Sequence, residues 1–251
     1  MIKVISLLKF QLKVLSMYFK DSNWSKEKTK EFFFYILYYL MNICYYSFLC
    51  FAEYIFILKN KKLKEIDNKI TDIYKNDNQF WVSLKEGYSI KTEKISNLTY
   101  GETSYLAIKY SLDFIKLNSQ DVFYDLGCGT GKNVFFSNIV YNAKSIGIDL
   151  IKSFIDNANN IVKEFDLKNI TFIRKSIFDA DLNNGTVFYI TPTCFDRDNL
   201  NKLFNKIKTL PKGSRLIVLS IEINLPELKK LGQKKLFYSW GLADTFYYQV
   251  V

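Results

Sequence analysis

The chain has 251 residues and a formal net charge of +10, and it is long enough to bury one sizeable core and carry an extension. It contains no histidine, which excludes Ser-His-Asp triads, histidine-ligated metals and an imidazole base. Its four cysteines form no C-x-x-C pair, so we expect neither a disulfide framework nor a bound metal.

The positive charge is spread along the chain rather than gathered in one block. A charge of this sign favours an acidic surface, nucleic acid or anionic lipid as a partner. The sequence has no run of five or six basic residues and no base-flipping motif, both of which would indicate nucleic-acid binding. We therefore do not expect nucleic acid as a partner.

Residues 1–20 place polar side chains at steps of three and four, which predicts a helix with a narrow polar stripe. Such a helix lies on a membrane surface or against a protein core. Lys9 and Lys13 interrupt its apolar run and no small-residue cleavage site follows, so the segment does not fit a signal peptide.

Residues 32–52, "FFFYILYYLMNICYYSFLCFA", carry no charge, and apolar character resumes after Glu53 up to Leu58. That length can span a bilayer, but lysines flank it on both sides and give no clear orientation. The alternative is a soluble helical hairpin. It is favoured by a polar face of the helix, which carries Tyr35, Tyr38, Asn42, Tyr45 and Glu53. We expect residues 1–58 to form apolar helices that associate with a membrane.

Residues 59–99 are polar and predict a linker with a solvated helix. From residue 100 onward, short apolar strands alternate with amphipathic helices, which predicts a doubly wound, mostly parallel α/β sheet. The expected strands are 122–126, 145–150, 170–175, 186–190, 215–221, 235–240 and 245–251. The last two are separated only by "GLAD" and therefore predict an antiparallel hairpin that closes a seven-strand sheet.

The strand "VFYD" runs directly into "LGCGTG" and a helix that begins near Lys132. In such a turn, glycines let a ligand lie on the backbone, where helix N–H groups face it. The glycines lack the G-x-G-x-x-G spacing of dinucleotide binders; they are Gly127, Gly129 and Gly131.

Two carboxylates indicate which ligand fits this turn. Asp125 precedes the first glycine, where it would repel a pyrophosphate and suit a positive charge. Asp149, at the end of the next strand, is placed to accept both hydroxyls of a ribose. A cationic adenosine cofactor satisfies both carboxylates, and S-adenosyl-L-methionine (AdoMet) is such a cofactor.

Together, "DLGCGTG" and "GID" resemble the first two motifs of class I methyltransferases, over roughly residues 100–251. This resemblance implies AdoMet binding and a seven-strand sheet that ends in a hairpin. "YGETS" ahead of the glycine turn is similar, more narrowly, to the non-SET lysine methyltransferases of the disruptor-of-telomeric-silencing type. Three later stretches agree with that family: "VFYITPTCF", "LPKGSRLIVLS" and "SWGLADTFYY".

The narrower resemblance implies roles for individual residues. Thr191 takes a catalytic position after the fourth strand, where that family carries asparagine, and an aromatic group helps to line a substrate channel: Trp240, Tyr247 and Tyr248. The implied cofactor-binding residues are Tyr100, Glu102, Thr103, Asp125, Gly127, Gly129, Gly131, Lys132, Asp149, Ser176 and Ile177. Ser176 stands where the family has an acid that faces adenine, and Asp179 is a substitute three residues later.

Structural alternatives exist for two of these assignments. Thr99 and Glu102 have the T-x-x-E spacing of a helix capping box, with Gly101 between them. The aromatic residues of the last two strands also suit ordinary packing of a terminal hairpin.

The function we expect is AdoMet-dependent methylation of lysine side chains in a protein, by a domain at residues 100–251. The alternatives are methylation of a small molecule or lipid, and a catalytically silent AdoMet-binding membrane adaptor. We expect membrane association with the catalytic domain on the cytoplasmic side, or a cytoplasmic protein if the N-terminal helices are soluble.

Overall fold

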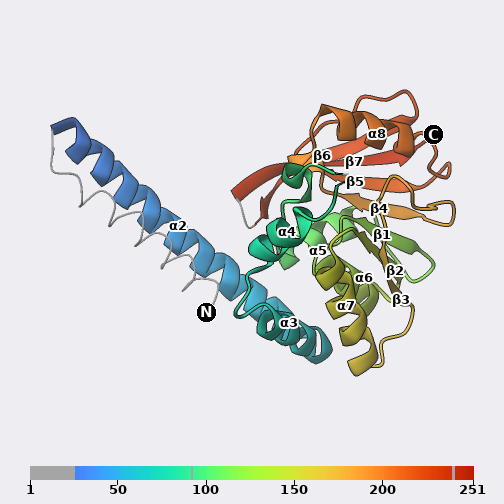
Figure 1. Ribbon diagram of the computed structural model, residues 1–251, viewed down its shortest axis with the longest axis horizontal. Coiled ribbons are helices and arrows are strands. Elements are labelled where there is room, and N and C mark those ends of the chain that lie inside the picture. The colour runs from blue at the N-terminus through green and yellow to red at the C-terminus, as the bar shows by residue number, and fades with distance from the viewer. Residues whose placement is uncertain (1–25, 92, 239–240) are drawn as a thin grey trace. The chain divides into compact units, whose positions relative to one another are not determined.

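The computed structural model describes residues 26–91, 93–238 and 241–251 (Figure 1). The chain divides into two compact units, residues 1–60 and residues 61–251. The helix expected over residues 1–20 lies outside the described residues.

The first unit contains one described helix, α2 (Lys26–Leu58). Within it, Thr29–Ile57 is long and apolar enough to cross a membrane by length and composition. At 1.5 Å per residue this stretch is about 44 Å long, against a hydrocarbon core of about 30 Å. Many of its large apolar side chains are exposed, among them Phe33, Phe34, Leu37, Leu40, Met41, Phe48, Phe51 and Ile55.

The second unit is built on a seven-strand sheet in the order β3-β2-β1-β4-β5-β7-β6. The first five strands are parallel, and β7 runs antiparallel to both β5 and β6. The α/β fold expected from the sequence is confirmed. The strands are β1 (Val122–Leu126), β2 (Lys144–Asp149), β3 (Ile170–Arg174), β4 (Val187–Ile190), β5 (Arg215–Leu219), β6 (Leu228–Tyr238) and β7 (Gly241–Val250).

The terminal hairpin is longer than the sequence predicted. Strand β6 begins at Leu228 and β7 at Gly241, so "GLAD" is part of β7 and does not separate the strands. Lys235 pairs with Asp244 across the hairpin. Because β6 is an edge strand with an exposed, lysine-rich face, its first half lacks the apolar run by which strands are recognised.

Helices cover both faces of the sheet and bury one apolar cluster on each. On one face, α6 (Lys132–Tyr141) and α7 (Lys152–Glu164) pack with Phe172 of β3. On the other face, α8 (Arg197–Ile207) packs against β1, β4, β5 and β7. Helix α5 (Tyr105–Phe114) precedes β1, and its Ile108 and Leu112 are fully buried.

Residues 61–98 belong to the same compact unit as the sheet, although the sequence suggested a polar linker. They form α3 (Lys61–Ile73), α4 (Gln79–Gly87) and the 3₁₀ helix η1 (Ile95–Leu98). Helix α3 buries Leu63, Ile66 and Ile70, whose spacing of three and four makes one apolar stripe in a polar sequence. The polar composition of the segment conceals that stripe.

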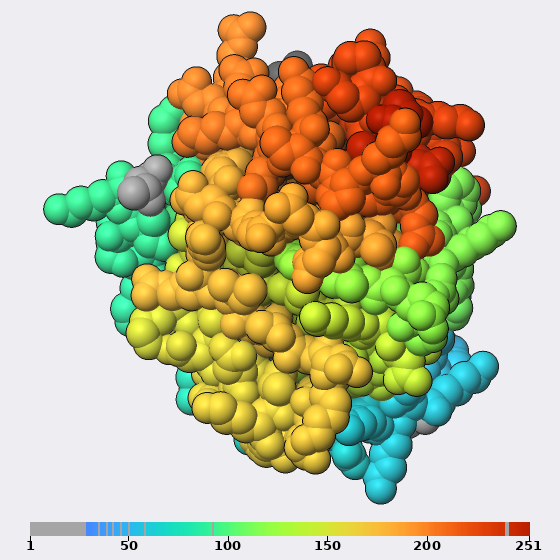
Figure 2. Space-filling model, turned by 90° about the vertical axis from the view of Figure 1, so that its right-hand side faces the viewer, coloured from blue at the N-terminus to red at the C-terminus, as the bar shows by residue number. Residues whose placement is uncertain are grey.

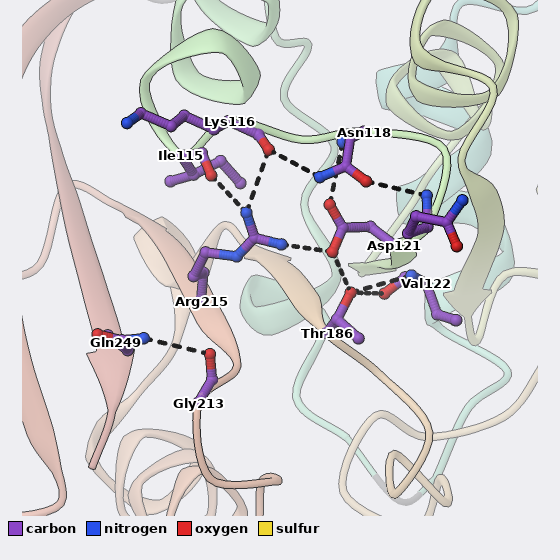
Figure 3. Close-up of polar contacts among 10 residues, drawn as sticks. Ile115, Lys116, Asn118, Asp121, Val122, Thr186, Gly213, Arg215 and Gln249 are labelled. Atoms are coloured by element: carbon purple, nitrogen blue, oxygen red, sulfur yellow. Dashed lines mark hydrogen bonds and ion pairs between the residues drawn. The ribbon is translucent and has the colours of Figure 1, made fainter.

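A polar network ties the sheet together where β1, β4 and β5 begin (Figure 3). The carboxylate of Asp121 accepts hydrogen bonds from Thr186 Oγ1 (2.8 Å) and from the backbone N–H of Asn118 (3.0 Å). It also forms an ion pair with Arg215, which donates to the carbonyl of Ile115 at 2.5 Å. Asp121 is only 6% exposed, and both of its oxygens have partners.

Candidate active site

A cavity lies at the carboxyl ends of the parallel strands. It encloses about 820 Å³ of empty space, part of it open to solvent. The chain turns outward from β1 in one direction through β2 and β3 and in the other through β4 and β5, and ligands of open α/β sheets bind at this switch point. Many of the lining residues lie at or just after the ends of the parallel strands: Leu126, Gly127 and Gly129 at β1, Asp149, Leu150 and Ile151 at β2, Ser176 and Ile177 at β3, and Thr191 and Phe195 at β4.

The glycine turn after β1 is held by the carboxylate of Asp149. Gly129 N–H donates to Asp149 Oδ2 at 2.8 Å, and Ile151 N–H donates to Oδ1 at 2.9 Å. Each oxygen keeps a second lone pair, so the carboxylate can still accept two hydroxyl groups from the cavity. Gly129 has φ +51°, and a Cβ there would stand 2.6 Å from the ring of Tyr100, which explains why only glycine fits.

Asp125, near the end of β1, is a buried acid that lacks a complete set of partners. It is not itself among the residues that line the cavity, but Leu126 and Gly127, which follow it, are. Its side chain is 3% exposed, and its Oδ2 has no hydrogen-bond partner. Burial, reinforced by the charge of Asp149, raises the pKa of Asp125 to about 8. Because an unpartnered buried oxygen is costly, a cationic group beside it is favoured. The amino group of AdoMet meets that requirement, so the residues present fit this cofactor.

The loop "YGETS" lies directly against the glycine turn. The hydroxyl groups of Tyr100 and Thr130 are 3.2 Å apart, and burial raises the pKa of Tyr100 well above its usual value. Glu102 Oε1 forms an ion pair with Lys132 Nζ at 2.7 Å, and both side chains are largely buried. Lys132 is the first residue of α6, so this pair fixes the loop to the helix that follows the glycines.

The end of the same loop is attached to the terminal hairpin. Thr103 forms an isolated antiparallel bridge with Tyr238, and its hydroxyl lies 3.3 Å from that of Tyr189. Ser104 Oγ donates to the carbonyl of Phe237 at 2.6 Å. The loop therefore spans the carboxyl ends of the strands, from the glycine turn to β6.

The capping-box alternative for this loop is wrong. Helix α5 begins at Tyr105, and its N-cap is Ser104, whose Oγ accepts from Ala107 N–H at 3.1 Å. Thr99 instead ends η1, and the Glu102 carboxylate is paired with Lys132. The T-x-x-E spacing is therefore coincidental here, because the helix starts six residues after Thr99.

The residues expected after β3 and β4 also line the cavity. Ser176 and Ile177 lie on its β3 side, and Thr191 follows β4, which pairs with β1. Asp179 is exposed and is not among the lining residues, so it does not take the place of an acid at position 176.

Tyr247 and Tyr248 are not brought to the cavity. As neighbours on β7 they point to opposite faces of the sheet. Tyr247 is hydrogen-bonded to Ser111 (3.1 Å between hydroxyl oxygens) and stacks on Phe114 at 4.2 Å between ring centroids. Tyr248 accepts from Ile223 N–H at 2.8 Å within the α8-side cluster. Trp240 lies outside the described residues.

Several lining residues were not predicted from the sequence. Asn97 of η1 accepts from Asp196 N–H at 2.9 Å, which joins η1 to the start of α8. Asn199 Nδ2 donates to Glu93 Oε2 at 2.6 Å, and both residues line the cavity. These partners are about a hundred residues apart in the chain, and no local pattern marks them.

The fold and the site together define a class I methyltransferase. An RNA methyltransferase from Salinibacter ruber, solved with S-adenosyl-L-homocysteine, has a TM-score of 0.51 at 19% identity over 59% of this chain and 92% of its own. A geranyl diphosphate C-methyltransferase from Streptomyces coelicolor gives 0.50 at 13% identity, over 59% of this chain and 79% of its own. At these identities the likeness concerns the fold.

Within that class, the sequence model described as "Histone methylation protein DOT1" matches residues 90–229. The chain belongs to this family of class I AdoMet-dependent methyltransferases. A protein-lysine N-methyltransferase of Saccharolobus islandicus is 26% identical over 133 residues, which is 51% of this chain and 80% of that protein. A putative methyltransferase of Invertebrate iridescent virus 6 is 28% identical over 142 residues, 53% of this chain and 52% of that protein.

Proposed function

We propose that this protein transfers methyl groups from AdoMet to lysine side chains of a protein substrate. The observation that carries the proposal is the similarity to the protein-lysine N-methyltransferase of Saccharolobus islandicus, which extends over 80% of that enzyme. The family match supports it, because residues 90–229 include both the "YGETS" loop and the glycine turn.

In this proposal Asp125 and Asp149 hold two different parts of the cofactor, its aminoacyl portion and its ribose. Asp125 receives the amino group, and Asp149 receives the ribose hydroxyls while it keeps its bonds to Gly129 and Ile151. When bound, AdoMet supplies a methyl group activated by a sulfonium. Tyr100 and Glu102 keep the loop over the glycine turn and limit the access of water.

The chain needs only to align the acceptor amine and remove its water. Methyl transfer to an amine is an in-line displacement, for which positioning and desolvation are the main contributions. The amine must be neutral before it reacts, and its proton can pass to solvent, so the absence of histidine from the sequence is compatible with this chemistry. We assign Thr191 to the acceptor side, because it lines the cavity beside the end of β1.

We also propose that the apolar N-terminal region, residues 1–58, associates with a membrane and that the catalytic unit faces the cytoplasm. The supporting observation is the apolar stretch Thr29–Ile57 in α2. Membrane-embedded protein should resist alkaline carbonate and be released by detergent, whereas release by carbonate alone would contradict the proposal. Protease added to sealed cells should leave residues 61–251 intact, and digestion would place the catalytic unit outside.

The methylation proposal is tested with the full chain, radiolabelled AdoMet and a membrane-containing lysate. Label should enter the protein fraction and appear as methyllysine after acid hydrolysis. Asp125→Ala should abolish transfer, while Asp156→Asn, which removes an exposed carboxylate from α7, should not. Label confined to lipid would replace lysine by a lipid substrate, and AdoMet binding without any transfer would indicate a silent adaptor.

A further inference from the structure

The order of the strands sets the direction in which a cofactor lies in the cavity. Asp125 on β1 suits the amino group, and Asp149 on β2 suits the ribose. Neighbouring strands are about 4.8 Å apart, so the base extends one step further, toward β3. The cavity lining at that end is Lys175, Ser176, Ile177 and Phe178.

This base end is bordered by residues in α8 and just before it. The ring of Phe178 is 6.1 Å from that of Phe195, between centroids. Lys202 Nζ lies 5.4 Å from the centroid of the Phe178 ring and donates to Asn199 Oδ1 at 3.2 Å. Asn199, which is 4% exposed, therefore stands beside the base end with a fixed amide orientation.

Asn199 in turn holds Glu93. Its Nδ2 donates to Glu93 Oε2 at 2.6 Å, and no described residue donates to Glu93 Oε1. The segment that carries α4 and η1, in teal and green, borders the orange surface of the α8 region at the edge of the face in Figure 2. The contacts that place Glu93 at the cavity thus come from outside the sheet.

The chemistry of the lining distinguishes adenine from other purines. Among the described lining residues, only Glu93 and Asp149 carry carboxylates, and Asp149 is engaged at β2. Adenine carries an amino group at position 6, which can donate a hydrogen bond to a carboxylate. A 6-oxo purine presents an acceptor there, which a carboxylate repels. Ser176 carries no charge, and its Oγ already accepts from Phe178 N–H at 3.3 Å.

We propose that Glu93 recognises the 6-amino group of the cofactor's adenine and makes the site selective for adenine over a 6-oxo purine, with Asn199 as its positioning residue. The proposal rests on the use of AdoMet and not on lysine as the methyl acceptor. A failure of lysine methylation therefore leaves it intact.

The test measures binding of two ligands to the full chain in detergent by titration calorimetry. One is S-adenosyl-L-homocysteine, and the other is S-inosyl-L-homocysteine, which has an oxygen in place of the 6-amino group. The wild-type protein should bind the adenosyl compound about tenfold more tightly or better, the factor for one lost charge-assisted hydrogen bond.

Glu93→Gln should lower this ratio by about tenfold. Asn199 donates to one end of the glutamine amide, which leaves the NH₂ group toward the base, where it repels an amino group and binds an oxygen. Glu93→Ala should weaken binding of the adenosyl compound without strengthening binding of the inosyl compound. The two variants therefore separate recognition of the base from a general loss of binding. Thermal unfolding verifies that both are folded.

Glu164→Gln is the matched control, because Glu164 is a partly exposed glutamate on α7 that pairs with Lys69. The ratio of the two affinities in this variant should equal that of the wild-type protein. An unchanged ratio in Glu93→Gln, or equal binding of both ligands by the wild-type protein, would overturn the role of Glu93. If the wild type binds neither ligand, the proposal fails together with the cofactor assignment. A normal adenosyl preference without lysine methylation contradicts only the proposed substrate.

Discussion

Two aspartates at opposite ends of the β1 region, Asp121 and Asp125, differ in how their charges are satisfied. Asp121, just before β1, is saturated by Arg215, Thr186 and a backbone N–H (Figure 3). Asp125 is buried as deeply, yet one of its oxygens has no partner. The strand therefore carries a structural carboxylate at its amino end and, at its carboxyl end, a carboxylate that is incomplete until a ligand binds.

The largest effect we expect is loss of cofactor binding in Asp125→Ala. Removing one member of a buried charge pair costs about 4 kcal/mol, so affinity for S-adenosyl-L-homocysteine should fall about a thousandfold. Titration calorimetry measures it. Asp121→Asn, assayed below its unfolding temperature, should keep wild-type affinity. A comparable loss in both variants would contradict the division of roles.

Breaking the amino-end network should instead reduce stability. Asp121→Asn leaves Arg215 without its counter-ion in a largely buried site, and we expect a loss of about 3 kcal/mol in the free energy of unfolding. Urea denaturation followed by circular dichroism measures this change. Asp156→Asn serves as the control, since its ion pair with Lys152 is exposed and should contribute little. A destabilisation of equal size in the control would remove the special role of the network.

The pH dependence of stability should reveal the buried carboxyl group of Asp125. Burial raises the pKa of Asp125 to about 8, above its unfolded value near 4. Its contribution to stability is therefore complete below about pH 4 and is lost as pH rises toward 8. At pH 8, Asp125→Asn should unfold about 5 °C above the ligand-free wild-type protein, which corresponds to about 2 kcal/mol in the free energy of unfolding. Asp121→Asn should unfold below the wild-type protein. Scanning calorimetry between pH 5 and pH 8 follows the difference, and a pH-independent gap would show that Asp125 is already ionised and paired.

The sequence predicts the parts of the site that follow from local patterns, and it does not predict the contacts between residues that are far apart in the chain. Strand β1, its glycines and the start of α6 at Lys132 were predicted at the observed residues, because a strand, a glycine turn and a helix start are local patterns. The same holds for Asp125 and Asp149, whose positions follow from the strand ends. The hydrogen bond between Glu93 and Asn199 joins residues 106 positions apart, and only the folded chain brings them together.

Tyr247 and Tyr248 teach a different lesson. The resemblance assigned both to one channel, although adjacent residues of a strand face opposite sides of a sheet. The structure places Tyr247 against α5 and Tyr248 against the α8-side cluster. The strand period alone was enough to separate them. For α3, by contrast, the apolar stripe was present in the sequence and was obscured by the surrounding lysines.

The smallest effect should come from the loop that covers the carboxyl end. Tyr100→Phe keeps the ring over Gly129 and removes only the hydroxyl that bonds to Thr130. One hydrogen bond contributes about 1 kcal/mol, so affinity for S-adenosyl-L-homocysteine should fall about fivefold with little change in unfolding temperature. Amide hydrogen exchange of residues 99–104 should become faster in the ligand-free variant and slow again when the ligand binds.

Tyr110→Phe is the matched control for this change, because Tyr110 is 39% exposed on α5 and lies away from the glycine turn. It should alter neither the affinity nor the exchange of the loop. If Tyr100→Phe left both unchanged as well, the loop would be held by Glu102, Thr103 and Ser104 alone. Closure of the loop would then not contribute to the affinity for the ligand. The unpartnered carboxylate of Asp125 would be the only feature that distinguishes the ligand-binding carboxyl end of β1 from its amino end.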